Sequence, residues 1–99
     1  TLTDAATIAV DMSTFINAQV TLGGNRTLGQ PSNTKVGQSG FIRVIQDGTG
    51  SRTLAYHADW KFSGGTDPTA STAAGKTDLL FYTVIATNFI AASMTKGLA

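Results

Sequence analysis

The feature that most constrains this sequence is an alternation of apolar and polar residues near its middle. Between Leu54 and Phe62, the segment LAYHADWKF is apolar at every second position, and this is the period of a strand with one buried face. The pattern predicts that the only tryptophan, Trp60, points into the core, on the same face as Leu54, Tyr56, Ala58 and Phe62. The segment DGTGS at 47–51 separates this strand from the apolar run FIRVIQ, which favours a β-hairpin from Phe41 to Phe62. In its turn we expect Gly48 and Gly50 to adopt positive φ.

Shorter alternations predict strands on both sides of this hairpin. Thr7–Asp11 reads as an edge strand with Ile8 and Val10 on one face. After a bend near Ser13, a second strand runs from Ile16 to Leu22, and Gly23-Gly24-Asn25 is expected to be a turn. At the end of the chain, Asp78–Ala86 and Phe89–Thr95 are two strand-like arms around Thr87-Asn88, which predicts a terminal hairpin.

Two segments rich in Gly, Pro, Ser and Asn or Thr are predicted to be long loops, Gly29–Gly40 and Ser63–Thr77. Composition supports the same fold class, because the chain has sixteen threonines and no glutamate, a bias toward β-branched residues and away from strong helix formers. We therefore predict a single all-β domain over residues 1–99. Its expected architecture is an antiparallel β-sandwich, jelly-roll-like, of about seven to eight short strands, or a small barrel.

The strand predicted at Asp78–Ala86 is apolar on both faces. Leu79, Phe81 and Ile85 are expected to pack inside the domain. The opposite face then carries Leu80, Tyr82 and Val84, a stripe without any charge, and we predict it to be an oligomer interface because interfaces deplete charge and favour aromatic residues.

Residues that could carry chemistry are few. His57 and Asp59 could form an acid–base or metal pair, but on one strand face their side chains start about 7 Å apart, which favours a solvated surface. Asp47 could pair with Arg52 across the hairpin, but Asp before Gly is more often present for turn geometry. The absence of cysteine and of a second histidine leaves no transition-metal set, so we predict no catalytic residue, metal site or cofactor. Tyr56 and Trp60 could stack on a sugar, although a core stripe explains them better.

Charge and hydropathy exclude further classes of partner. The net charge of +1 gives no reason to expect nucleic acid. No apolar run approaches the roughly 18 residues of a membrane span, so membrane insertion is not expected. The chain begins at Thr1 without a signal peptide, which suggests a processed chain or a fragment.

A longer pattern resembles a β-module of tailed-bacteriophage virion proteins. It consists of NRTL, PSN, GQSG, QDGTGSRTL, WKF, GGTDPT and DLLFY in this order, and it covers roughly Asn25 to Phe89. Residues 25–99 would form the module, and residues 1–24 would add N-terminal strands outside it. Tail fibre, tail-tip and head-decoration proteins share the pattern.

The resemblance implies a location in the virion and a structural or assembly role without enzymatic activity. The implied partners are further copies of the chain, three in a fibre-like assembly, and other phage virion proteins. A receptor-facing module would also contact a glycan on the host surface. The alternative from a different class is a carbohydrate-binding, lectin-like module, which would need exposed aromatic rings. A small hydrolase is disfavoured because no serine elbow accompanies the single histidine.

Overall fold

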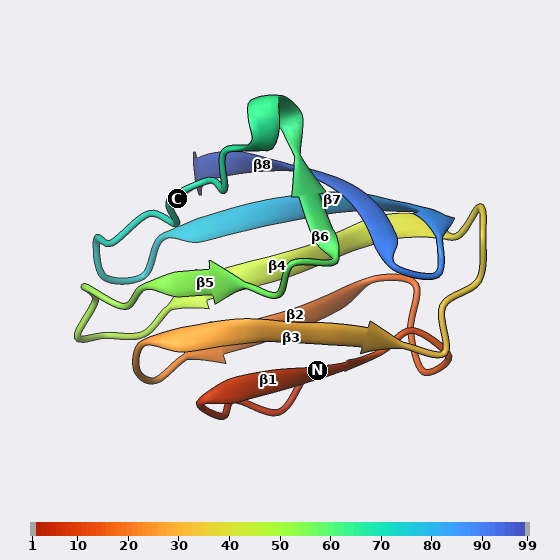
Figure 1. Ribbon diagram of the computed structural model, residues 1–99. Helices are drawn as coiled ribbons and strands as arrows, with labels where there is room; N and C mark the ends of the chain where they lie inside the picture. The colour runs from red at the N-terminus through yellow and green to blue at the C-terminus, as the bar shows by residue number, and fades with distance from the viewer. Residues whose placement is uncertain (1, 99) are drawn as a thin grey trace.

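The computed structural model describes residues 2–98, which form eight β-strands in two layers (Figure 1). The three strands of one sheet are β1 (Thr7–Asp11), β3 (Arg26–Ser32) and β5 (Leu54–Tyr56), in the order β1-β3-β5. The second sheet contains β2 (Ala18–Leu22), β4 (Ser39–Gln46), β6 (Trp60–Phe62), β7 (Thr77–Ala86) and β8 (Phe89–Leu98), in the order β2-β4-β7-β8-β6. Apart from a 3-10 turn at Ser63–Gly65, residues 2–98 contain no helix, and thus none that could span a membrane.

Strand pairing follows from the way the chain changes sheets. From β1 to β6 each strand lies in the sheet opposite to that of the strand before it. Three pairs of strands two apart in the chain lie side by side and are parallel: β1 with β3, β2 with β4, and β3 with β5. β6 and β8 are also parallel, and the antiparallel pairs are β4 with β7 and β7 with β8.

The three-stranded sheet is therefore parallel and the five-stranded sheet is mixed. This corrects the predicted antiparallel, jelly-roll-like sandwich, although the all-β class and the number of strands agree with the prediction. The sequence could not show whether neighbouring strands are parallel or antiparallel, because side chains alternate with the same period in both kinds of sheet.

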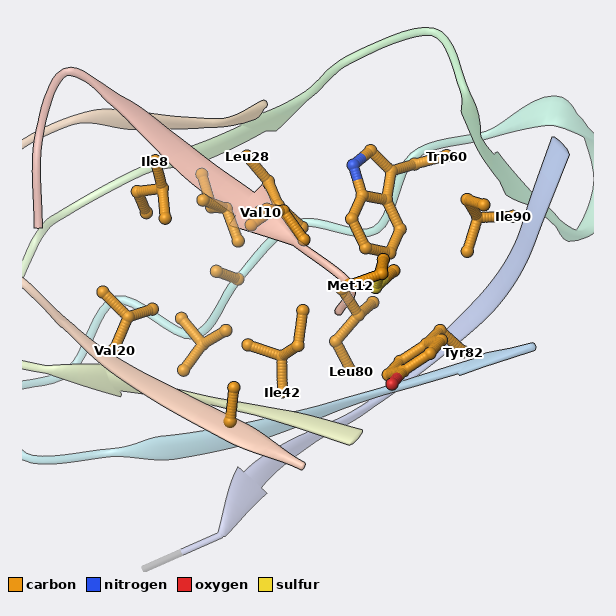
Figure 2. Close-up of a cluster of buried hydrophobic side chains, with 14 of the residues drawn as sticks. Ile8, Val10, Met12, Val20, Leu28, Ile42, Trp60, Leu80, Tyr82 and Ile90 are labelled. Carbon is orange, nitrogen blue, oxygen red and sulfur yellow. The ribbon is translucent and has the colours of Figure 1, made fainter. Parts of the chain in front are cut away.

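The hydrophobic core lies between the two sheets (Figure 2). Alternate residues of the three-stranded sheet point inward, such as Ile8, Val10 and Leu28, and meet Val20, Ile42 and Leu80 from the five-stranded sheet. Trp60 is 3% exposed, and its indole N–H donates a 2.9 Å hydrogen bond to the carbonyl oxygen of Gly29 in the opposite sheet. The predicted burial of Trp60 is confirmed, and this side chain ties the two sheets together.

Several local predictions are confirmed. β1 has the predicted bounds, lies at a sheet edge and buries Ile8 and Val10. The terminal hairpin forms from β7 and β8 around Thr87-Asn88. A turn at 23–25 separates β2 from β3, but β3 continues to Ser32 through residues that were predicted to be a loop.

The predicted hairpin from Phe41 to Phe62 does not form. Its first arm, β4, pairs with β2 and β7, whereas β5 pairs with β3 in the other sheet. The DGTGS segment therefore connects two sheets. The second arm is also not one strand, because a turn at 57–59 separates β5 from β6 and sends them to different sheets. Ala58, predicted to face the core, is exposed in this turn.

The two faces of β7 are the reverse of the prediction. Leu80, Tyr82 and Val84 are 0%, 2% and 1% exposed and point into the core, whereas Phe81 and Ile85 are 42% and 52% exposed. The physical reason is register: Leu80 aligns with Ile42 on β4, and Val84 aligns with Ile90 on β8, both of which are core residues. The stripe predicted to meet a neighbouring subunit is thus covered within the chain itself.

Candidate functional site

The outward side of the five-stranded sheet exposes apolar side chains. We call it the outer sheet face and define it by Phe41 on β4, by Leu79, Phe81 and Ile85 on β7, and by Phe89 and Ala91 on β8. Phe81 and Ile85 were predicted to lie inside, and they are now among the most exposed large apolar side chains. The sequence signal for this surface was that β7 is apolar on both faces. This pattern did not show which face of β7 points away from the core.

The middle of the outer sheet face is a ridge with a hollow on each side. Phe41 and Phe81 are register partners, and their rings meet edge to face with centroids 6.5 Å apart. A hollow of about 280 Å³ lies beside the ridge, over β7 and β8, where Thr83, Ala91 and Ser93 are small. A second hollow of about 300 Å³ lies on the other side, next to Phe41, and is lined by Asn17, Gln19 and Arg43.

Charges on this face are few and positive. Arg43 on β4 lies 3.5 Å from the side-chain oxygen of Gln19. The Lys61 ammonium on β6 lies 5.9 Å from the centroid of the Phe89 ring, a distance typical of a cation–π contact. The only aspartate in the strands of this sheet is Asp78, which is buried. The outer sheet face therefore has no carboxylate among its strand residues.

A second surface is a groove of about 740 Å³ formed by the turn after β1 and the loop between β3 and β4. We call it the end groove, and its lining residues are Met12, Ser13, Thr14, Phe15, Ile16, Asn33, Lys35, Val36, Gly37 and Gln38. Ile16 and Val36 are 61% and 68% exposed. This groove has no signal in the sequence, because its two segments are far apart in the chain and meet only in the fold.

Hydrogen bonds to polar side chains fix the shape of the end groove. The Asp11 carboxylate accepts hydrogen bonds from the Ser13 backbone N–H, the Ser13 hydroxyl and the Asn33 amide, which joins the two segments. These bonds, with the Ser13 hydroxyl as the main cause, lower the pKa of Asp11 below its ordinary value. The Gln38 side-chain amide donates to the carbonyl oxygens of Met12 and Phe15 from the opposite side.

His57 and Asp59, which the sequence placed on a solvated strand face, lie closer together than strand geometry suggested. Because these residues lie in the turn between β5 and β6, His57 Nδ1 is 3.6 Å from the Asp59 carboxylate and accepts the Asp59 backbone N–H at 3.1 Å. Asp59 also accepts a hydrogen bond from the Gln30 side chain on β3. In residues 2–98 no three His, Cys, Asp or Glu side chains are grouped to hold a metal ion. The contacts of this pair hold the turn against β3.

Asp47 and Arg52 form the ion pair that the sequence offered as the less favoured role of Asp47, with 3.0 Å between the guanidinium and the carboxylate. Asp47 also has the turn role considered from the sequence, because its Oδ1 accepts the backbone N–H groups of Thr49 and Gly50. Hydrogen bonds from Arg52 and Gly50 lower the pKa of the Asp47 carboxyl below its ordinary value.

The aromatic residues considered for sugar stacking are used in packing. Trp60 is buried, and the ring of Tyr56 packs edge to face on Phe62, with centroids 4.7 Å apart. The Tyr56 hydroxyl is buried without a hydrogen-bond partner among the described residues, and burial raises the pKa of this group. Trp60 thus belongs to the core, and the half-buried Tyr56 packs against its edge.

A protein-family model described as "Putative phage tail fibre C-terminal domain" matches residues 7–85. The matched region covers most of the chain and begins at Thr7, so it includes β1 and β2, which lay outside the residues that carried the resemblance. The match is to a tail fibre model and gives no support to capsid decoration. No match was found among curated proteins or among solved structures.

Proposed function

We propose that this chain, which belongs to the phage tail fibre C-terminal domain family and is thus a phage tail component, is a non-enzymatic structural module of the fibre. In this role it contributes a rigid, self-associating β-structure to the fibre, contacts other virion proteins, and presents its loops toward the host surface.

The observation that supports this proposal is that polar side chains form hydrogen bonds that fix the loops between strands. Asp11 holds the two segments of the end groove together, and Asp47 holds the loop after β4. Gln46 is buried and bonds both the backbone N–H and the carbonyl oxygen of Arg52. The buried Asp78 carboxylate accepts the backbone N–H groups of Ser71 and Gly97. Side chains used in this way stabilise loops of fixed shape, as a structural module requires.

The test is localisation on intact phage particles. Antibodies raised against the purified chain and coupled to gold should label the distal part of the tail fibres in electron micrographs. Particles from a mutant phage that lacks the coding region provide the control. Labelling of the capsid, or no labelling of accessible fibres, would contradict the proposed role.

The end groove supports a second candidate function, the binding of a host-surface glycan. Its volume lies in the range of small-ligand sites, and the Lys35 ammonium, the Asn33 side-chain oxygen and the lone pairs left on the Ser13 and Thr14 hydroxyls are the kinds of group that bind sugar hydroxyls and acidic sugars. We expect polysaccharide from a susceptible host strain to shift the NMR signals of Ser13 and Asn33. Lys35→Ala should weaken this binding, whereas Lys96→Ala, which removes an exposed lysine on β8, should not. Unchanged spectra at saturating polysaccharide would exclude this function.

A further inference from the structure

We propose that His57 is a proton-operated switch in the turn where the chain crosses between the two sheets. When the imidazole takes up a proton, its Nδ1 gives up the backbone N–H of Asp59 and donates to the Asp59 carboxylate instead. The contacts of this turn then depend on pH. This inference goes beyond the proposed role in the fibre and does not rest on it, because every contact that carries it lies within the described chain.

The turn at 57–59 is in contact with both sheets. It connects β5 in the three-stranded sheet with β6 in the five-stranded sheet (Figure 1). The His57 backbone N–H donates to the carbonyl oxygen of Leu28 on β3. The Asp59 carbonyl oxygen accepts the backbone N–H of Ile90 on β8. A change in the side-chain contacts of this turn therefore takes place at a point where the two sheets are joined.

The contact made by His57 Nδ1 defines the charge of the ring in this structure. Nδ1 lies 3.1 Å from the Asp59 backbone nitrogen and accepts its N–H. A ring nitrogen accepts a hydrogen bond only while it carries no proton, so this geometry belongs to the neutral imidazole with its proton on Nε2. A proton on Nδ1 would place two N–H donors against each other. The hydrogen bond to the Asp59 amide is therefore lost when the ring becomes charged.

The acceptor for a charged ring lies next to it. Asp59 Oδ1 is 3.6 Å from His57 Nδ1, just beyond hydrogen-bond distance. The Asp59 side chain is 12% exposed, and among residues 2–98 its carboxylate accepts one hydrogen bond, from the Gln30 side chain to Oδ2. A largely buried carboxylate is stabilised by a hydrogen-bonded cation. The His57 side chain is 39% exposed, which leaves the ring room to turn from the amide to Oδ1.

Other titratable groups near the ring do not compete with Asp59. The hollow of about 270 Å³ beside His57 is also lined by Lys61 on β6, Asp67 in the second long loop and Tyr56 on β5. Tyr56 stays uncharged because burial raises the pKa of its hydroxyl. The hydrogen bonds from β3 and β8 to this turn involve uncharged groups of those strands. Among the described residues, the Asp59 carboxylate alone lies within 4 Å of a nitrogen of this imidazole.

An NMR titration of the whole, unmodified chain from about pH 8 to about pH 5 tests the proposal, because histidine changes charge in this range. His57 is the only histidine, so the ring signals are assigned directly. At the upper pH the ring nitrogens should show the Nε2–H form. As the ring becomes charged, the Asp59 amide should lose protection from hydrogen exchange, after correction for the intrinsic effect of pH. The amides of Trp60 and Ile90, which donate to backbone carbonyl oxygens, should keep their protection.

Two results of this titration would overturn the proposal. One is a neutral ring with its proton on Nδ1, and the other is an Asp59 amide that stays protected when the ring is charged. Both are read on the unmodified chain, so they do not depend on the folding of a variant.

Three variants separate the ring from its surroundings. In His57→Gln the side-chain oxygen can accept the same N–H but takes up no proton, so the protection of the Asp59 amide should not change across the titration. In Asp59→Asn the charged ring loses its acceptor, and the midpoint of the ring titration should move to lower pH. Asp67→Asn is the matched control, because it removes the other carboxylate at the hollow and should leave the midpoint unchanged. A persistent step in His57→Gln, or equal midpoints in the two aspartate variants, would refute the switch.

Discussion

Gly50 lies where the chain leaves β4 for the other sheet, with a φ of 72°. A Cβ atom at this position would approach the Ala74 backbone nitrogen and the Thr72 carbonyl oxygen to 2.8 Å. The expected positive φ is therefore confirmed at Gly50, but Gly48 does not adopt it, and a Cβ there would meet nothing within 4 Å. The two glycines look alike in sequence, and only one of them is required by the backbone.

This difference gives a matched pair of substitutions. Gly50→Ala should lower the free energy of unfolding by about 1–3 kcal/mol, because it combines an unfavourable φ with a backbone clash. Gly48→Ala should change it by less than about 0.5 kcal/mol. Urea unfolding followed by Trp60 fluorescence measures both. Equal stabilities of the two variants would show that the loop after β4 has a different conformation.

Asp47 provides a prediction of pH dependence. Its pKa in the folded chain is lowered by Arg52 and the turn N–H groups, so its contribution to stability is fully present above the ordinary aspartate pKa of about 3.9. This contribution is lost as the pH falls through the lower folded value. Asp4 and Asp11, whose pKa values are also lowered, add to the same trend.

We therefore expect the urea midpoint to fall between about pH 5 and about pH 2, and Asp47→Asn to reduce this fall. The control is Asp67→Asn, which changes an exposed aspartate in the second long loop and should retain the wild-type pH profile. Identical pH profiles for Asp47→Asn and the wild type would mean that the Asp47–Arg52 pair does not form in solution.

Elements distant in sequence are joined by single buried side chains. Asp78 at the start of β7 is 2% exposed, and its two carboxylate oxygens accept the backbone N–H of Ser71 at 2.7 Å and that of Gly97 at 2.9 Å. One side chain thus connects the second long loop and the end of β8 to β7. A charge is tolerated in this buried position because both oxygens are hydrogen-bonded.

Replacing Asp78 by alanine should cost about 2–4 kcal/mol, because two partly buried donors lose their acceptor. Hydrogen exchange at Ser71 and Gly97 should accelerate more than exchange in β4, which separates a local effect from general destabilisation. Asp67→Ala in the same loop is the control and should change neither quantity. Unchanged exchange at Ser71 in Asp78→Ala would contradict the assigned contacts.

At the scale of the whole molecule, most strand pairs join segments that are far apart in the chain. Only β7 and β8 are both consecutive and paired, and every other pair has at least one strand between its members. Each non-local pairing closes a loop before its contacts form, which slows folding. The protein should therefore refold in milliseconds to seconds, like other all-β proteins.

Stopped-flow dilution from urea tests this expectation, because Trp60 becomes buried only when the two sheets meet. The protein is kept dilute so that association of copies does not contribute to the signal. Trp60 burial within microseconds would indicate that local structure dominates the folding transition state, contrary to the topology.

The sequence by itself determined what depends on local chemistry. Alternation and turn residues located β1, β2, β4 and the terminal hairpin, predicted that Trp60 is buried, and placed Asp47 in a turn. Each of these features depends on residues a few positions apart, where strand period and turn preferences act directly. The resemblance to phage virion proteins used the same local motifs, and the family match agrees with it.

Only the tertiary structure decided which strands pair and which face of β7 is inside. The DGTGS turn reverses the chain equally well within one sheet or between two, and the alternation from Leu54 to Phe62 does not reveal the turn at 57–59 that divides it. On β7 both faces are apolar, so burial was assigned by register with Ile42 and Ile90 rather than by period. For this reason the interface predicted on one face of β7 turned out to be the core face. Hydrophobicity predicts that a side chain is covered, but the residues that cover it depend on the fold of the whole chain.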